Sequence, residues 1–348
     1  VVLDGCHIKA EYGGVLLVMT VLDGDGHVFP AAIGIAESEN QETWRWFVAL
    51  VRAGLRIEDG GAGIVVLSDR EKGIDIALNE LLPRARHSFC VYHIMKNVKK
   101  EFHTTLDGRL FKAAKAPSQK EFDDVMDEIQ GANEDAGKYI EKIEREKWAR
   151  AFFPARRFGH VTSNISESMN KWLDDARHMD PVGLFAFYIM KLNNLFEKRR
   201  EKYASVPPSH LPKNVQKMFT KSVNESRSLR VVRNTKRFFA VQRLNDRCAT
   251  RVVDVEVATC SCGFYKEHGV PCRHLCAASL FEKENPQKYV IHERQLDALQ
   301  ATYSGVTVPV DVANLRNNGL KPPTMTRRRG RPKEKRYVSA TEKSQRRL

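Results

Sequence analysis

Residues 1–37, VVLDGCHIKAEYGGVLLVMTVLDGDGHVFPAAIGIAE, decide the fold of this chain. They contain three apolar, β-rich runs, VVLD, GVLLVMTVLD and HVFPAAIGIAE, which are separated by segments that include Gly and Asp. Runs of this kind between turn residues predict three strands in an antiparallel meander. Pro30 lies inside the third run, and because proline has no N–H to donate to a sheet ladder, we expect that run to be an edge strand.

Helix and strand patterns alternate after the meander. One helix is predicted by apolar residues that recur at i, i+3, i+4, i+7 and i+11: Trp44, Phe47, Val48, Val51 and Leu55. The run IVVLSD (64–69) predicts a fully buried strand, GIDIALNELLP (73–83) a helix, and RHSFCVYH (86–93) a further strand.

This order of elements predicts an α/β fold with a ribonuclease-H-like mixed sheet, in which the first and fourth strands lie side by side. Asp4 and Asp69 then end adjacent strands. Residues 94–160 have many Glu/Lys pairs at helical spacing and predict a helical insertion. A last helix from about Asn164 to Arg200 would complete a domain of residues 1–203.

Four segments follow this domain. The Pro/Ser-rich stretch SVPPSHLPK opens a basic linker of residues 204–237. Residues 238–285 predict a small ββα module, and residues 286–320 a C-terminal extension. Residues 321–348 are rich in Pro, Arg and Lys with little to bury, so we expect a disordered basic tail.

Positive charge gathers in two of these segments. The whole chain has a formal charge of +14, with 13 Lys and Arg against 3 Asp and Glu in residues 191–237, and 11 against 2 in residues 321–348. Such clusters are typical of proteins that bind the phosphate backbone of DNA, although a solvated surface could also carry them.

The tail sequence RRRGRPKEKR offers candidate nucleic-acid contacts. An extended Gly-Arg-Pro segment between cationic residues fits the narrow minor groove of A·T-rich DNA. A nuclear-import signal and a nonspecific phosphate-binding arm remain alternatives. The residues concerned are Arg327, Arg328, Arg329, Arg331 and Lys333.

Composition also indicates in which kind of cellular compartment the protein is expected. No stretch approaches the ~20 continuous apolar residues of a membrane helix, and the first residues lack the features of a secretory signal, so we expect a soluble protein without a membrane partner. Seven cysteines, crowded toward residues 260–276, indicate a metal site in a reducing compartment more than a disulfide framework.

Three acids are candidate metal ligands: Asp4 in VVLD, Asp69 in IVVLSD and Glu167 in TSNISESMN. Carboxylates at the ends of adjacent strands, with one from a facing helix, can hold two Mg²⁺ or Mn²⁺ ions for phosphodiester displacement. Each acid also has a structural interpretation. Asp4 could be a turn residue before Gly5, and Asp69 could cap the helix that follows it. Glu167 stands three residues after Asn164, which is the spacing of a capping box.

A zinc site is predicted by CSCGFYKEHGVPCRH, which supplies Cys260, Cys262, Cys272 and His274. Three thiolates and an imidazole at this spacing form a closed tetrahedral site, which is structural and not catalytic. We expect Cys276 to be a buried spare thiol, and His268 is a less favoured substitute ligand. Cys90 and His93 form a lone CxxH pair, either accessory to a site or a buried thiol beside a hydrogen-bonded histidine.

The segments DGCHIK, VVLSDREKG, FCVYHIMKN and TSNISESMNKWL resemble, in order and spacing, the transposases of Mutator-like DNA transposons. The zinc segment is similar to the SWIM finger that follows the catalytic domain in that family. The resemblance implies that Asp4, Asp69 and Glu167 form a DDE triad with two divalent metals, and that Cys90 and His93 match the family's C(2)H motif. It further implies a metal-dependent DNA transposase, acting in the nucleus on transposon ends and target DNA as a homo-oligomer.

Two alternatives to an active transposase remain open. The family also has domesticated relatives, such as the far-red-responsive transcription regulators of plants, which bind DNA without catalysis. A general SWIM-containing interaction protein would explain residues 240–280 but not the first half. Family members usually carry a DNA-binding domain before the first acid, and nothing precedes Val1 here, so we expect the chain to be a fragment. Cys6 stands where many members have threonine.

Overall fold

A computed structural model describes residues 1–305 of the chain, apart from residues 71–72, 163 and 245. Two sequence-based predictions therefore lie outside the described residues. They are the disorder of residues 321–348 and the nucleic-acid contacts of Arg327, Arg328, Arg329, Arg331 and Lys333. Within the described part of the chain, no helix is both long enough and apolar enough to cross a membrane.

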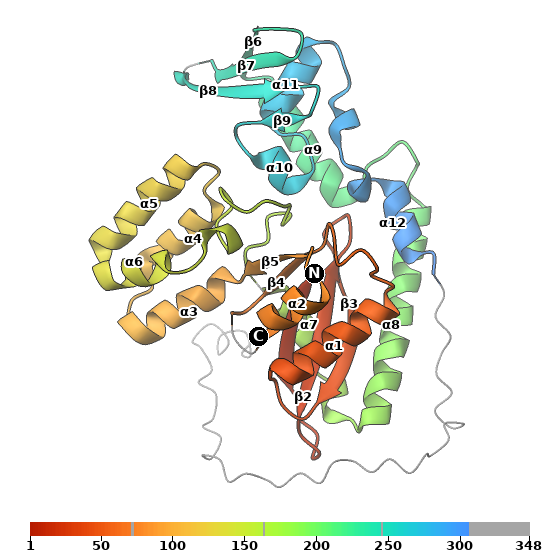
Figure 1. Ribbon diagram of the computed structural model, residues 1–348. Coiled ribbons are helices and arrows are strands. Elements are labelled where there is room, and N and C mark those ends of the chain that lie inside the picture. Colours follow the sequence, from red (N-terminus) through yellow and green to blue (C-terminus); the bar gives the residue numbers. More distant parts are fainter. Residues whose placement is uncertain (71–72, 163, 245, 306–348) are drawn as a thin grey trace, which may run out of the picture. The chain divides into compact units, whose positions relative to one another are not determined.

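The N-terminal sheet has five strands in the order β3-β2-β1-β4-β5 (Figure 1). Its strands are β1 (Val2–His7), β2 (Val15–Leu22), β3 (Val28–Ala36), β4 (Val65–Ser68) and β5 (Arg86–Phe89). β1, β2 and β3 pair antiparallel, whereas β4 runs parallel to both β1 and β5. The predicted meander and the predicted contact between the first and fourth strands are both confirmed.

β3 is an edge strand, as Pro30 predicted. Pro30 stands opposite Thr20, next to a register shift between Met19 and Thr20. The missing N–H of proline is tolerated there because no further strand needs it on the outer side.

Helices cover both faces of this sheet. Leu17 and Met19 of β2 belong to an apolar cluster with α1 (Gln41–Gly54) and α2 (Ile74–Leu81). Leu16 and Val18 belong to a second apolar cluster, which also contains residues of α8 (Pro181–Ala204) and of the segment that precedes α8. Because successive side chains of a strand point to opposite faces, burial on both sides explains why β2 is almost continuously apolar.

Three sequence-based predictions about element boundaries are wrong. α1 ends at Gly54, so Leu55 lies beyond its buried stripe and is 49% exposed. β5 ends at Phe89, so CVYH does not extend a strand and instead opens α3 (Val91–Phe102). The single helix predicted after about Asn164 is two helices, α7 (Asn164–Trp172) and α8, with a short 3₁₀ turn, η3 (Ala176–His178), between them.

The break before α8 has a local cause. The side chain of Asp180 accepts hydrogen bonds from the backbone N–H groups of Val182 and Gly183, which makes Asp180 an N-cap. Pro181 follows in the first turn, where its missing N–H costs nothing, whereas in a continuous helix it would remove a hydrogen bond.

The segment predicted as a helical insertion consists of helices up to Lys147, and the apolar core that it forms also includes Phe89 of β5 and Val161. Its elements are α3, η1 (Leu106–Gly108), α4 (Arg109–Lys115), α5 (Gln119–Ala132), α6 (Glu134–Glu141) and η2 (Arg145–Lys147). Ile94, Leu110, Ile129, Ile140 and Trp148 are nearly inaccessible to solvent and belong to one cluster. The charged residues that dominate the sequence here lie around that core.

The zinc-finger region is larger than the predicted ββα module. A second sheet, in the order β6-β7-β8-β9, comprises β6 (Leu229–Arg233), β7 (Phe238–Arg243), β8 (Asp246–Asp254) and β9 (Thr259–Cys260). Two helices accompany it, α10 (Phe264–His268) and α11 (Arg273–Phe281). The predicted basic linker contains α9 (Lys213–Ser226) and β6, neither of which the sequence-based interpretation expected.

The chain then returns to α8. After η4 (Pro286–Tyr289) and η5 (His292–Arg294), α12 (Leu296–Tyr303) contributes Leu296, Leu299 and Tyr303 to a cluster with Tyr203 of α8. The Tyr303 hydroxyl donates a 2.7 Å hydrogen bond to Asp23 in the β2–β3 turn.

Asp25, in the same turn, caps the N-terminus of α9, a helix that lies far from it in the sequence. Asp25 is buried, with 2% of the residue exposed. Its Oδ1 accepts hydrogen bonds from the backbone N–H groups of Asn214, at 2.8 Å, and Val215, at 3.2 Å. A carboxylate at a helix N-terminus satisfies donors that have no partner inside the helix.

We expect Asp25→Ala to lower the free energy of unfolding by about 2 kcal/mol, because buried N–H groups of α9 would lose their acceptor. Urea denaturation followed by circular dichroism would measure the loss. Asp59→Ala is the matched control, since Asp59 is exposed and accepts one hydrogen bond, from Gly61, in a surface turn. An unchanged midpoint for the Asp25 variant would show that the cap contributes nothing.

Candidate active site and zinc centre

The parallel pairing of β1 with β4 brings Asp4 and Asp69 together. Val2 stands opposite Leu67 in this pair, and each acid follows two residues later along its strand direction. Val2, Leu67, Cys90 and Ile165 form an apolar cluster on that side of the sheet. Asp4 lies within β1 and not at its end, because β1 continues to His7.

A third carboxylate lies against Gly5, the residue after Asp4, and acts electrostatically on Asp4. Glu39 belongs to the loop between β3 and α1, and its Oε2 is 2.6 Å from the point that a Cβ on Gly5 would occupy. Only glycine at position 5 leaves room for this carboxylate without displacing it. Sequence reasoning missed Glu39, and the signal available was the acidic ESEN segment that precedes α1.

The site raises the pKa of Asp4 to about 6. Burial is the main cause, and the neighbouring carboxylates Glu39 and Asp69 act in the same direction. A hydrogen bond from the Asn170 side-chain amide to Asp4 Oδ2, 3.1 Å long, acts against them. Carboxylates that repel one another in a partly buried place are suited to binding a cation, because the cation offsets that repulsion.

The third predicted acid, Glu167, lies on α7 and is exposed. Asn170, whose amide contacts Asp4, follows it by three residues, about one helical turn, and was also missed from the sequence. Among the described residues, the acids do not gather into a group of three ligand atoms within 4.8 Å of one another. The structure thus brings Asp4, Asp69 and Glu39 into one neighbourhood and places Glu167 on the adjoining helix.

Cys90 and His93 lie next to this acidic neighbourhood. Cys90 is fully buried at the N-cap position of α3, and His93 is in the first turn of that helix. A hydrogen bond with Cys90 raises the pKa of His93, and the charge of Asp69 adds to the effect. His93 in turn lowers the pKa of Asp4. The pair is therefore an electrostatic neighbour of the acids.

We expect Gly5→Ala to weaken Mn²⁺ binding about tenfold, because the new Cβ would displace the Glu39 carboxylate, and changes next to metal ligands typically cost 10–100-fold in affinity. Calorimetric titration of the metal-free chain with Mn²⁺ would measure the affinity. Gly54→Ala is the control, since a Cβ at Gly54 meets nothing within 4 Å. Equal affinity in the Gly5 variant and the wild type would exclude Glu39 from the site.

The four predicted zinc ligands come together. The ligand atoms of Cys260, Cys262, Cys272 and His274 all lie within 4.8 Å of one another. Cys260 Sγ is 3.7 Å from His274 Nδ1, and Cys272 Sγ accepts the backbone N–H of Leu275 at 3.4 Å, which caps α11. Hydrogen bonds from Cys260 and Cys272 lower the pKa of the Cys262 thiol. This donor set and spacing fit one structural Zn²⁺ ion.

Two neighbours of the zinc group behave as the sequence predicted. Cys276 is fully buried, and its Sγ contacts the carbonyl oxygen of Pro271 at 3.8 Å. His268 does not belong to the ligand group. Its ring lies 4.4 Å from that of Phe264, and burial lowers its pKa to about 4.

Two segments of the chain match known protein families. Residues 1–97 match the MULE transposase domain, and residues 239–282 match the SWIM zinc finger. The chain is 29% identical over 165 residues to Protein FAR-RED IMPAIRED RESPONSE 1 of Arabidopsis thaliana, a match that covers 44% of this chain and 20% of that protein. The match thus spans about one fifth of the length of the curated relative. One segment of the chain thus matches the MULE transposase domain and another the SWIM zinc finger, and part of the chain is similar to Protein FAR-RED IMPAIRED RESPONSE 1.

Proposed function

We propose that this chain is the catalytic core of a DNA transposase that cleaves and joins DNA strands with the help of divalent metal ions. The observation that carries the proposal is the proximity of Asp4, on β1, to Asp69, which directly follows the parallel strand β4, inside the segment that matches the MULE transposase domain. A sheet in the order β3-β2-β1-β4-β5 with these acids at its centre supports a ribonuclease-H-like fold.

In this proposal Asp4 and Asp69 hold the metal, and Glu167 completes the triad as the family resemblance implies. Carboxylate oxygens are the donors that Mg²⁺ and Mn²⁺ prefer. Two such ions, when bound, activate the attacking oxygen and stabilise the leaving oxygen of a phosphodiester. Glu39 is a further carboxylate next to Asp4, and Asn170 orients Asp4 through its amide.

In this proposal His93 acts on Asp4 and Asp69 through its charge. It lies close enough to Asp4 and Asp69 to interact with both electrostatically, and its hydrogen bond with Cys90 favours the protonated ring. A protonated His93 reduces repulsion among the acids before metal binds.

Strand transfer of a labelled, pre-cleaved transposon end in Mg²⁺ or Mn²⁺ tests the proposal. Low salt and high DNA concentration let nonspecific phosphate contacts assist binding. Metal-dependent joining that Asp69→Asn abolishes would establish the activity. Glu167→Gln and Glu39→Gln, assayed in parallel, identify the third essential carboxylate: we expect Glu167→Gln to abolish joining and Glu39→Gln to weaken it through metal affinity.

A DNA-binding regulator without catalysis is the second candidate. The match to Protein FAR-RED IMPAIRED RESPONSE 1, together with the basic residues of segments 191–237 and 321–348, favours it. DNA binding without strand joining and without Mn²⁺ affinity at the acids would decide for this candidate. Both candidates act on DNA in the nucleus, and the transposase would work as a homo-oligomer that pairs transposon ends.

A further inference from the structure

The side of α7 that packs toward the sheet is partly polar. α7 lies against β1, β2 and β3. Ile165, Ser166 and Met169 are its buried residues, and Asn170, which is half-buried, follows Ser166 by one helical turn on the same side. Glu167 is exposed. The side of α7 that reaches Asp4 is therefore the one that carries Ser166 and Asn170.

Two polar atoms on this side of α7 are buried and have no hydrogen-bond partner among the described residues. They are Ser166 Oγ and Asn170 Oδ1. A buried acceptor costs free energy when nothing donates to it, so most such atoms in native proteins have a partner. For an oxygen that no protein group contacts, that partner is a water molecule or a cation.

Asp4 fixes the orientation of the Asn170 amide. Nδ2 of Asn170 donates a 3.1 Å hydrogen bond to Asp4 Oδ2. Because an ionised carboxylate only accepts hydrogen bonds, the nitrogen of the amide and not its oxygen must face Asp4. Oδ1 belongs to the same planar amide group, so it also lies next to Asp4. Asp69 is close enough to raise the pKa of Asp4, which places this oxygen beside both acids.

We propose that Asn170 Oδ1 is a ligand of the divalent cation that Asp4 and Asp69 hold, an inference that rests on the proposed metal site. Carbonyl oxygens join carboxylates among the ligands that suit Mg²⁺ and Mn²⁺. The amide is neutral, so it adds a ligand without adding to the repulsion among the acids. One side chain thus fixes Asp4 through its N–H and contributes an oxygen to the cation. Asn170 adds to the acidic triad and does not replace Glu167.

Calorimetric titration of the metal-free full chain with Mn²⁺ at pH 8 tests this with two variants of one residue. Asn170→Ala removes both the donor and the oxygen, and we expect the affinity to fall at least about tenfold. Asn170→Asp keeps an oxygen in the same place but cannot donate to Asp4. We expect its affinity to stay within about threefold of the wild type, because a carboxylate oxygen is also a good Mn²⁺ ligand. Circular dichroism would show that both variants fold.

The two variants separate a metal ligand from a residue that only positions Asp4. If Asn170 acted through its N–H alone, Asn170→Asp would be at least as harmful as Asn170→Ala, since neither donates and aspartate adds repulsion. Equal losses of affinity in the two variants would therefore overturn the ligand role. Unchanged affinity in Asn170→Ala would overturn it as well, and this outcome requires only the alanine variant to fold.

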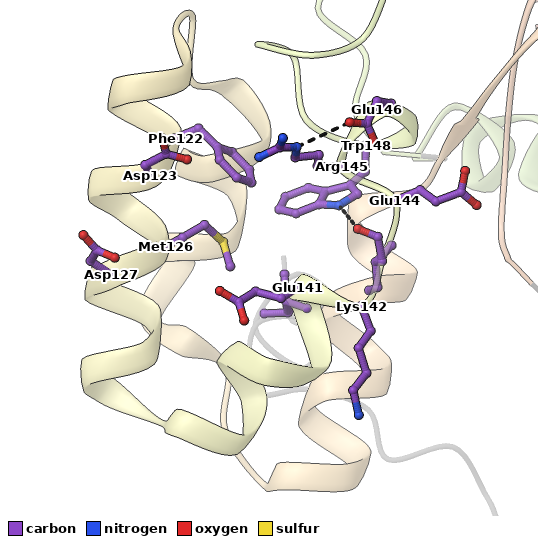
Figure 2. A pocket seen from close by; sticks show the side chains of 12 residues that line it. Phe122, Asp123, Met126, Asp127, Glu141, Lys142, Glu144, Arg145, Glu146 and Trp148 are labelled. Carbon is purple, nitrogen blue, oxygen red and sulfur yellow. Dashed lines mark hydrogen bonds and ion pairs between the residues drawn. The ribbon is translucent and has the colours of Figure 1, made fainter.

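Two controls account for charge and for other acids. Asn224→Asp adds the same charge at an exposed position of α9. Acids of the helical insertion could also bind Mn²⁺, since Asp123, Asp127 and Glu141 line a pocket there (Figure 2). Asp127→Asn measures that background, and we expect the affinity of both controls to stay within about twofold of the wild type. A loss in Asp127→Asn as large as that in Asn170→Ala would place the titrated ion in the insertion and overturn the inference.

Failure of this inference differs from failure of the proposed function. A wild-type chain that binds no Mn²⁺, or that binds it equally well after Asp69→Asn, would overturn the metal site and the role of Asn170 with it. Binding that Asp69→Asn abolishes and Asn170→Ala leaves intact would overturn the role of Asn170 alone.

Discussion

Asp4→Asn should abolish strand transfer and at the same time stabilise the metal-free protein. Loss of one metal-binding carboxylate removes several kcal/mol of transition-state stabilisation, which corresponds to at least about a thousandfold in rate. The gain in stability has a separate origin. Burial and the neighbouring carboxylates raise the pKa of Asp4 to about 6, so the ionised form is disfavoured in the folded state.

The sign of the stability effect follows from proton linkage. The folded pKa of Asp4 is about 6 and its usual value is 3.8, so between these values the folded state binds more protons than the unfolded state. The contribution of Asp4 to stability is therefore full below about pH 4 and is lost as the pH rises through 6. Asparagine carries no charge, and we expect the variant to be more stable by about 1–3 kcal/mol at pH 8 and equal to the wild type near pH 4.

Urea unfolding of both proteins, with EDTA present to remove divalent metal and at several pH values, measures this difference directly. Asp59→Asn is the control, since Asp59 is exposed in a turn. A difference between Asp4→Asn and the wild type that stays constant from pH 4 to pH 8 would contradict the raised pKa. Added Mn²⁺ should stabilise the wild type more than the variant, because Asp4 is then a ligand.

The same pKa predicts the pH dependence of metal binding. A proton on Asp4 competes with the cation, so the affinity of the wild type for Mn²⁺ should fall by up to about tenfold for each pH unit below 6. Titration at pH 5, 6, 7 and 8 would show a break near 6. A pH-independent affinity across this range would remove Asp4 from the set of ligands.

Removal of zinc should unfold the zinc-finger region while the N-terminal sheet stays folded. Structural zinc contributes about 10–16 kcal/mol in small zinc-finger peptides near pH 7, which exceeds what the modest core around Phe239, Val253 and Leu275 can supply. Hydrogen exchange after chelation should show loss of protection in β7, β8 and α11, with protection retained in β1 and β2. Mass spectrometry under native conditions should find one zinc ion per chain before chelation.

Cys272→Ser and Cys276→Ala form a matched pair for this prediction. Both thiols are buried at the start of α11, but only Cys272 belongs to the ligand group. We expect Cys272→Ser to lose zinc and Cys276→Ala to retain one ion per chain. Full zinc content in the Cys272 variant would mean that another residue completes the site.

The sequence by itself determined the features that depend on neighbours along the chain. The three strands of the meander follow from apolar runs between segments with Gly and Asp, and the edge position of β3 follows from Pro30, because proline acts through its own missing N–H. The zinc ligands were predictable for the same reason, since all four lie within fifteen residues and thiolate chemistry specifies the metal. The error at Leu55 arose because the apolar period continues one residue past the end of α1, and the error at CVYH because a short apolar run does not distinguish a strand from the start of a helix.

Tertiary structure alone decided the features made by residues far apart. The Glu39 carboxylate lies against Gly5 because Gly5 has no side chain, and no local pattern connects positions 5 and 39. Asp25 caps a helix that begins near residue 213, and Trp148 packs against Phe122 of α5 in the core of the insertion. In each case the contact depends on how separate elements pack, and the periodicity of a single element carries no information about its partner.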